Sequence, residues 1–196
     1  ERMGRIQGQL VEGSVERITI EYRGEVTAQA TSPLTSAVLK GVMEIFAADD
    51  TVNLVNAPVV AQERGIRVDE LKSSAPEDYA SLLTVIVEAG GQRRVLSGTL
   101  FGRRDPRIVR FDEYAIDAAP DGHMLFYLND DIPGIIGRVG SAMGGHKVNI
   151  ARMNCGRQQV GGKALTVLNV DSHMPQTVLD ELLQDPHISW ARQVAL

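Results

Sequence analysis

The order of the elements predicted in the second half of the chain constrains its fold more than any other feature. Alternating apolar and polar residues predict strands, and apolar residues three to four positions apart predict helices. The strands are expected at 123–128, 148–156, 163–170 and 188–194, and the helices at 133–145 and 175–184. Strand-helix-strand-strand-helix-strand within about 70 residues is the order of ferredoxin-like split βαβ folds. We therefore expect a ferredoxin-like domain in this half.

The first half of the chain predicts a different, mixed arrangement of helices and strands. Strands are expected at 15–22, 67–73, 82–89, 93–101 and 107–111, and helices at 32–48 and 56–65. Asp49-Asp50 is expected to end the first helix, and Gly90-Gly91 predicts a hairpin that makes its two strands antiparallel. The fold class of the whole chain is therefore α+β.

A stretch of small and turn-forming residues, 118–122, has no periodicity and is interpreted as a short link between two domains. The first domain is then expected at 1–120 and the second at 121–196. The chain opens at Glu1 without a leader segment, so it is expected to be processed or cut from a longer protein.

Charge and cysteine content exclude several classes of partner. The formal net charge is -5 and the isoelectric point about 5.4, with no basic tail, so we expect no nucleic-acid partner. No apolar run approaches the roughly 20 residues that a membrane span needs, so no membrane partner is expected either. Cys155 is the single cysteine, which excludes an internal disulfide and favours a reducing cytoplasm as the location.

Three polar residues near one predicted helix start form the strongest candidate site. Asn129 and Asp131 precede the helix that Pro133 opens, and Asn149 begins the next strand. Asp131 is expected to cap the helix by accepting from its free amides. A zwitterion would fit there, its carboxylate attracted to the helix N-terminus and its ammonium to Asp131. We infer a sensor for a small amino acid; the alternative is that Asp-x-Pro-Gly is only a turn and a cap.

Small residues recur along the same predicted helix. Gly137, Ser141 and Gly144 form a stripe that permits close approach to a sheet or to another copy of the chain. Tight packing inside one subunit is the expected explanation, and contact between subunits is the alternative.

A cluster of arginines stands out against the acidic background. Its members are Arg93, Arg94, Arg103, Arg104, Arg107 and Arg110. Guanidinium groups bind phosphate and carboxylate in a two-pronged manner, so an anionic metabolite could dock there, chiefly on Arg103, Arg104 and Arg107. The alternative is a set of ordinary surface ion pairs.

Motifs for cofactor chemistry are absent from the sequence. There is no Gly-x-Gly-x-x-Gly turn and no P-loop, and the four histidines never recur at metal-ligand spacing. Neither a catalytic residue, a metal site nor a bound cofactor is expected. Cys155 is expected to be a small, half-buried and inert side chain.

Three segments of the first half carry a family resemblance. They are Glu21-Tyr22-Arg23-Gly24, the run Val52-Asn53-Leu54-Val55-Asn56-Ala57-Pro58 with its continuation to Ile66, and Ser97-Gly98-Thr99-Leu100-Phe101-Gly102. They resemble the intervening domain of long D-3-phosphoglycerate dehydrogenases, and the second half resembles the ACT domain that ends those enzymes. Together the two resemblances cover essentially the whole chain.

The resemblance implies a parent oxidoreductase of serine synthesis that converts 3-phosphoglycerate to 3-phosphohydroxypyruvate with NAD. Nothing here matches the dinucleotide fold or the catalytic residues of that family, so a regulatory fragment without its own activity or NAD is implied. The family's serine-binding positions fall on Asn129, Asp131 and Asn149, and its anion-contacting basic residue falls on Arg107. Paired ACT domains are implied, hence a homodimer, with a tetramer left open for the parent.

Two alternatives remain at this stage. One is a stand-alone ACT-type module that binds an amino acid. The other is the related regulatory domain of an L-serine dehydratase, whose iron–sulfur cluster would need more cysteines than Cys155 supplies.

Overall fold

The computed structural model describes residues 1–46, 52–75, 78–102 and 104–196. The expected helix end at Asp49-Asp50 lies outside the described residues. The chain divides into two compact units, Glu1–Asp112 and Glu113–Leu196. Among the described helices, none is long and apolar enough to cross a bilayer.

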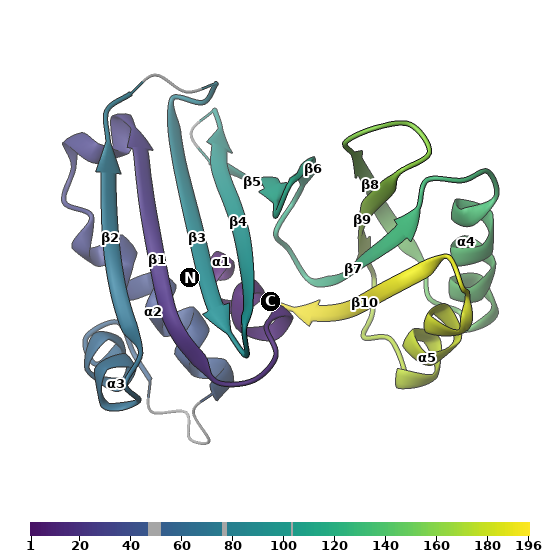
Figure 1. Ribbon diagram of the computed structural model, residues 1–196, viewed down its shortest axis with the longest axis horizontal. Coiled ribbons are helices and arrows are strands. Elements are labelled where there is room, and N and C mark those ends of the chain that lie inside the picture. The colour runs from purple at the N-terminus through teal and green to yellow at the C-terminus, as the bar shows by residue number, and fades with distance from the viewer. Residues whose placement is uncertain (47–51, 76–77, 103) are drawn as a thin grey trace. The chain divides into compact units, whose positions relative to one another are not determined.

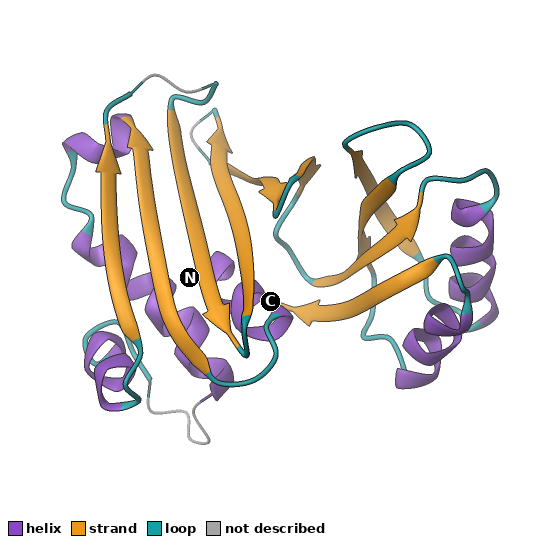
Figure 2. Ribbon diagram, viewed as in Figure 1, coloured by secondary structure: helices purple, strands orange, loops and turns teal. Residues whose placement is uncertain are grey.

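The first unit combines a sheet with helices on one face (Figure 2). Its elements are α1 (Arg2–Leu10), β1 (Val15–Gly24), the 3-10 turn η1 (Glu25–Ala28), α2 (Ser32–Phe46), α3 (Ala57–Glu63), β2 (Arg67–Ser73), β3 (Ser81–Ala89), β4 (Gln92–Phe101) and β5 (Asp105–Phe111). The strand order is β2-β1-β3-β4-β5, and β2 is an edge strand (Figure 1). Parallel pairing of β1 with β2 requires a crossover, which α2 and α3 provide.

The core of the first unit lies between its sheet and its helices. Ile18, Ile20 and Tyr22 alternate along β1 toward Val38 and Val42 of α2, and all five are fully or almost fully buried. The predicted hairpin at Gly90-Gly91 is confirmed, because β3 and β4 pair antiparallel around it. Both glycines have positive φ, as the tight turn requires.

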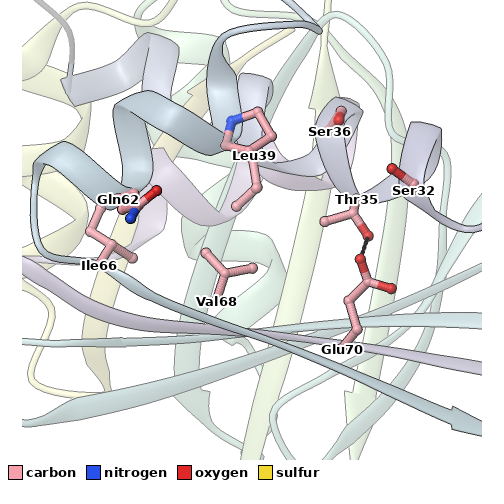
Figure 3. A pocket seen from close by; sticks show the side chains of 9 residues that line it. Ser32, Thr35, Ser36, Leu39, Gln62, Ile66, Val68 and Glu70 are labelled. Atoms are coloured by element: carbon pink, nitrogen blue, oxygen red, sulfur yellow. Dashed lines mark hydrogen bonds between the residues drawn. The ribbon is translucent and has the colours of Figure 1, made fainter.

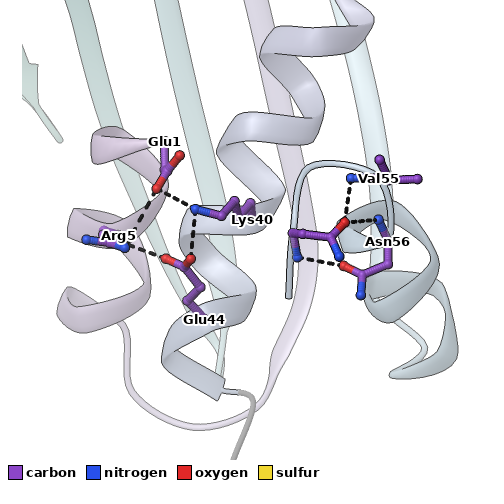
Figure 4. Close-up of polar contacts among 7 residues, drawn as sticks. Glu1, Arg5, Lys40, Glu44, Val55 and Asn56 are labelled. Atoms are coloured by element: carbon purple, nitrogen blue, oxygen red, sulfur yellow. Dashed lines mark hydrogen bonds and ion pairs between the residues drawn. The ribbon is translucent and has the colours of Figure 1, made fainter. Parts of the chain in front are cut away.

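Helices α1 and α2 approach each other unusually closely. A Cβ added at Gly41 would overlap the carbonyl oxygen of Glu1, so only glycine fits at this crossing. Ion pairs stabilise the same contact: Lys40 Nζ lies 2.7 Å from Glu1 Oε1 and 2.9 Å from Glu44 Oε1 (Figure 4). Burial alone would raise the pKa of Glu44, but hydrogen bonds from Arg5 and Lys40 outweigh it, and the pKa of Glu44 is lowered.

Before α3, two asparagines fix a tight turn. Asn53 Oδ1 accepts hydrogen bonds from the amides of Val55 at 2.9 Å and Asn56 at 3.0 Å, and Asn56 Oδ1 accepts from the amide of Asn53 at 2.7 Å (Figure 4). Short polar side chains can accept hydrogen bonds from nearby backbone amides in this way, and they then take the place of water as acceptors in the turn. This turn positions Ala57 at the start of α3.

The second unit has the expected ferredoxin-like order. Its elements are β6 (Tyr114–Ala118), β7 (His123–Asp130), α4 (Ile135–Gly145), β8 (Ile150–Arg157), β9 (Lys163–Val170), α5 (Gln176–Gln184) and β10 (Ile188–Ala195). The sheet order is β10-β7-β9-β8 with antiparallel neighbours, so β8 is an edge strand. The α+β class predicted for the chain is confirmed.

Helices α4 and α5 cover one face of this second sheet (Figure 1). Leu125 and Tyr127 of β7 and Leu168 of β9 meet Val139 of α4 and Val178 of α5, and each of these side chains is buried. The short strand β6 was not anticipated from the sequence. It contacts β8, where a Cβ at Gly156 would overlap the carbonyl oxygen of Ala115.

Candidate functional site

Sheet register places Asn129 and Asn149 at opposite ends of the second sheet. Asn129 pairs with Ala164 of β9, which pairs with Arg157 of β8. Asn149 directly precedes Ile150, whose partner is Val170 at the other end of β9. Positions 164 and 170 are roughly 20 Å apart along a strand that rises about 3.3 Å per residue. Within a single copy of the domain, Asn149 and Asn129 therefore lie far apart, at opposite ends of the sheet.

Asn129 lies near the end of β7 beside Thr166 of β9, and both residues are buried. The side chain of Asn129 is only 2% exposed; Nδ2 donates to the carbonyl oxygen of Asp130 at 2.7 Å, and Oδ1 accepts from Thr166 Oγ1 at 3.3 Å. Thr166 Oγ1 also lies 3.4 Å from Cys155 Sγ. Burial raises the pKa of the neighbouring Tyr127 to about 12, so this hydroxyl stays neutral.

Asp131 lies in the turn before α4 and is held by the end of β8 and by the turn between β8 and β9. Arg157 Nη1 donates to its Oδ2 at 2.7 Å, and the amide of Gly161 donates to the same oxygen at 3.1 Å. These bonds, from Arg157 first and Gly161 second, lower the pKa of Asp131. The carboxylate is thus ionised and oriented.

The predicted capping role of Asp131 is wrong. Helix α4 begins at Ile135, and its N-cap is Gly134, at φ +91°, with no side-chain cap from any described residue. The positive φ of Gly134 turns the chain so that the helix starts two residues after Pro133. Asp131 faces Arg157 instead, a charged donor that the sequence places 26 positions away.

A second ionised aspartate lies beside the first. Asp130 accepts from Lys163 Nζ at 2.7 Å and from His187 Nδ1 at 2.9 Å, and Lys163 followed by His187 lowers its pKa. The ends of β7 and β8, the start of β9 and the turn before β10 thus gather two carboxylates and three basic side chains. Sequence reasoning missed Arg157, Lys163 and His187, because only the strand register brings them to this end.

Asn149 is exposed at the other end of the sheet. Its Nδ2 donates to Asp171 Oδ2 at 2.7 Å, and its carbonyl oxygen accepts from the amide of Asp171 at 3.2 Å. This pairing fixes the turn that enters β8 and leaves the Asn149 side chain near the edge of the sheet.

The outer face of α4 is open. Around Gly137 and Gly144 of the predicted stripe, and around Gly140 on the same face, an added Cβ would meet no described atom within 4 Å. Ser141, the third member of the stripe, is exposed, and Ile136 is 54% exposed. The expectation that the stripe packs tightly inside one subunit is therefore wrong. The buried residues of α4 are Ile135, Val139, Ala142 and Met143, which pack in the core. The glycines lie on the opposite face of the helix.

The arginines of the first unit are largely engaged nearby. Arg107 Nη2 lies 2.7 Å from Asp105 Oδ2, and its guanidinium lies 5.7 Å from the ring centre of Phe101. Arg94 Nη1 makes a 2.8 Å ion pair with Asp112. Arg104 is exposed in the turn after β4. Arg103 lies outside the described residues.

Cys155 is exposed, which corrects the expectation of a half-buried side chain. It belongs to β8, and an edge strand has a neighbouring strand on one side only. No group of three or more histidine, cysteine, aspartate or glutamate side chains suited to a metal ion occurs in the described part of the chain.

Fold and site together define a two-domain α+β protein whose second domain is ferredoxin-like, with an ionised polar cluster at its β7–α4 turn. Residues 1–112 match the family model of the D-3-phosphoglycerate dehydrogenase intervening domain, and residues 123–187 match that of the ACT domain. The chain belongs to the D-3-phosphoglycerate dehydrogenase family. The resemblance inferred from its sequence segments is thereby confirmed.

Several curated relatives are similar over almost the whole chain. The D-3-phosphoglycerate dehydrogenases of Synechocystis and Archaeoglobus fulgidus are 37% identical over 197 residues and 39% identical over 184 residues, covering 100% and 93% of this chain. The Bacillus subtilis enzyme is 34% identical and covers 95%. The chain spans only 34–35% of the length of these relatives.

Proposed function

We propose that this chain is the regulatory region of a D-3-phosphoglycerate dehydrogenase and that its ACT domain binds L-serine as an effector. ACT domains generally bind amino acids and serve regulation or dimerisation. The parent protein would be a cytoplasmic oxidoreductase of serine biosynthesis, oxidising 3-phosphoglycerate to 3-phosphohydroxypyruvate with NAD. The names of the similar proteins support this activity, and the remaining two thirds of such a protein would carry catalysis and NAD.

The separation of Asn129 and Asp131 from Asn149 is the observation that carries the proposal. Edge strand β8 runs from the Asn149 end of the sheet to the Asp131 end. If two copies pair antiparallel along β8 about a twofold axis, Asn149 of one copy lies beside Asp131 of the other. Two identical effector sites then form, each from both copies.

The open face of α4 supports this pairing. Helix α5 packs on β10, at the edge opposite β8, so α4 occupies the β8 half of the sheet. Gly137, Gly140 and Gly144 expose their backbone there, which lets two helices approach closely without side-chain collisions. A continuous sheet with paired α4 helices would bury this face in a homodimer.

The charges at the proposed site suit an amino-acid zwitterion. The ammonium group would take the place of Arg157 on Asp131, and the released guanidinium would bind the carboxylate of the same ligand. Asn149 of the paired copy can donate to and accept from the serine hydroxyl. Serine would regulate a distant active site if it binds the two global states of the enzyme unequally.

Isothermal titration with L-serine tests the proposal. The wild type is expected to bind with a micromolar to millimolar Kd, and Asp131→Ala and Asn149→Ala are expected to lose binding. Asp180→Ala is the matched control, because this exposed carboxylate lies on α5, where it accepts a hydrogen bond from Gln176 of the same helix. Equal binding by all four proteins refutes the site.

Heterodimers distinguish a shared site from a site within one copy. Co-expression of differently tagged Asp131→Ala and Asn149→Ala chains, purified through both tags, yields dimers with one intact pair of Asp131 and Asn149 across the axis. One serine per heterodimer is expected, against two per wild-type dimer. No binding by the heterodimer contradicts the shared site.

A further inference from the structure

A pocket of about 400 Å³ lies in the first unit, between α2, α3 and edge strand β2 (Figure 3). Its size falls within the range of small-molecule sites, roughly 300 to 1,000 Å³. Neither the resemblance nor the proposed serine site uses it. All the residues that line it belong to the described part of the chain.

One end of the pocket is apolar. Leu39 of α2, Ile66 after α3 and Val68 of β2 line it, and Leu39 and Ile66 are both buried. Pro58 of α3 extends the same wall. This end offers a surface for a hydrocarbon group, which gains free energy when it leaves water.

The other end of the pocket carries the Glu70 carboxylate. Figure 3 shows Thr35 and Glu70 directed toward each other, with Ser32 and Ser36 nearby and Gln62 at the opposite side. Thr35 Oγ1 donates to Glu70 Oε1 at 2.6 Å, and Thr31 Oγ1 donates to Oε2 at 3.2 Å.

A relay of hydroxyls orients this carboxylate. Tyr22 Oη lies 2.7 Å from Thr35 Oγ1, and because the single Thr35 hydrogen goes to Glu70, Tyr22 must be the donor. Tyr22 is fully buried and Thr35 is almost so, which makes the relay rigid. Burial raises the pKa of Tyr22, and the charge of Glu70 raises it further, against the bond with Thr35.

The negative charge of Glu70 lacks a positive partner among the described residues, since no lysine, arginine or histidine there forms an ion pair with it. Each carboxylate oxygen accepts one hydroxyl hydrogen, and a carboxylate has about four acceptor positions. Two positions therefore remain for a donor from the pocket. A cationic donor gives the stronger hydrogen bond to an ionised acceptor.

We propose that this pocket binds a small molecule that carries an ammonium group on an aliphatic stem. The ammonium group donates to Glu70, with Ser32 and Ser36 close by, and the stem lies along Leu39, Ile66 and Val68. Gln62 offers an amide to a polar group at the far end of the ligand. This site lies wholly within the first unit and is independent of serine binding.

Methyl NMR of the chain tests the proposal with n-pentylammonium, 1-pentanol and pentanoate as probes. Saturable shifts of the Leu39, Ile66 and Val68 methyl resonances are expected with n-pentylammonium. Binding of 1-pentanol is expected to be about tenfold weaker, because it lacks the charged hydrogen bond. Pentanoate is expected to give no saturable shift. No shift with n-pentylammonium, or equal binding of amine and alcohol, overturns the proposal.

The variant Glu70→Gln removes the negative charge at nearly the same size, and its single amide oxygen can still accept from Thr35, while its Nε2 replaces the oxygen that accepts from Thr31. It is expected to abolish the preference for the amine over the alcohol, while Glu16→Gln, which removes an equal charge outside this pocket, keeps it. An unchanged preference in Glu70→Gln, or an equal loss in Glu16→Gln, refutes the assignment. Serine binding is expected to persist in both variants, so failure here leaves the proposed function standing.

Discussion

The Arg157 guanidinium at the end of β8 donates to the Asp131 carboxylate at 2.7 Å and so joins an edge strand to the turn that opens α4. The carboxylate that we assign to the ligand's ammonium group is thus already bound to a cation. Ligand entry exchanges one charged partner for another, which avoids leaving Asp131 or Arg157 unpaired. The edge strand β8, which would pair with a second copy, also carries Arg157, the residue that we assign to the ligand's carboxylate.

Replacing Arg157 by glutamine is expected to raise the pKa of Asp131 toward the ordinary aspartate value of about 3.9. The hydrogen bond from Arg157 is the largest cause of the lowered pKa of Asp131, ahead of the one from the Gly161 amide. The pKa of Asp130 should stay low, because Lys163 and His187 hold it. Carbon-13 NMR titration of the aspartate carboxyls measures both values in one experiment.

The same pair makes stability depend on pH in a defined direction. A carboxyl with a lowered pKa in the folded state stabilises the fold above its unfolded pKa, and this stability is lost as pH falls through the folded value. Wild type should therefore lose more stability than Arg157→Gln below about pH 4, the region of the unfolded aspartate pKa. Identical acid denaturation curves would contradict the role of Arg157.

Placing a large side chain on the open face of α4 is expected to block self-association without unfolding the chain. A Cβ added at Gly140 meets no described atom within 4 Å in one copy, so the fold should tolerate Gly140→Arg. Sedimentation velocity should show monomers for Gly140→Arg and dimers for the control Gln184→Arg, which adds the same charge on exposed α5. Dimers of Gly140→Arg with unchanged affinity would exclude this face as the interface.

Gly156→Ala is expected to destabilise the second unit by about 1–3 kcal/mol, the usual cost of overpacking. The new Cβ would overlap the backbone carbonyl of Ala115, which cannot move aside as a flexible side chain can. Urea denaturation of the whole chain measures the loss. Gly145→Ala is the control, because its Cβ would enter open space at an ordinary φ, and it should change stability little.

Gly41→Ala is expected to separate α1 from α2. Its Cβ would overlap the carbonyl oxygen of Glu1, and the separation would also break the ion pairs of Lys40 with Glu1. Faster amide hydrogen exchange throughout α1 is the measurement, with Glu63→Ala at the exposed end of α3 as the control. Unchanged exchange in α1 would show that the crossing can relax.

Much of the fold follows from local patterns in the chain. The alternation in β1 and the turn glycines at Gly90-Gly91 predicted a strand and a hairpin that the structure contains. The ferredoxin-like order was likewise readable from the periodicity of the second half. Strand β6 escaped prediction because its sequence begins with three apolar residues in a row, Tyr114, Ala115 and Ile116, and so lacks the alternation that indicates a strand.

The candidate site was less predictable than the elements that carry it. Capping chemistry pointed to Asp131, but the residue that holds it, Arg157, is distant in sequence and reaches it only through the pairing of β7, β9 and β8. The stripe of small residues on α4, Gly137, Ser141 and Gly144, was visible in the sequence, but its orientation was not. Which helix face the sheet buries depends on where Val139 and its apolar neighbours pack.

The sequence by itself determined the type and order of the elements, because hydrophobic periodicity and turn chemistry act over a few neighbouring residues. Only the tertiary structure decided that β8 lies at an edge, that Asn149 and Asp131 occupy opposite ends of one sheet, and that Glu70 faces a pocket. These relations depend on strand register and helix packing between segments far apart in the chain, which no local pattern specifies.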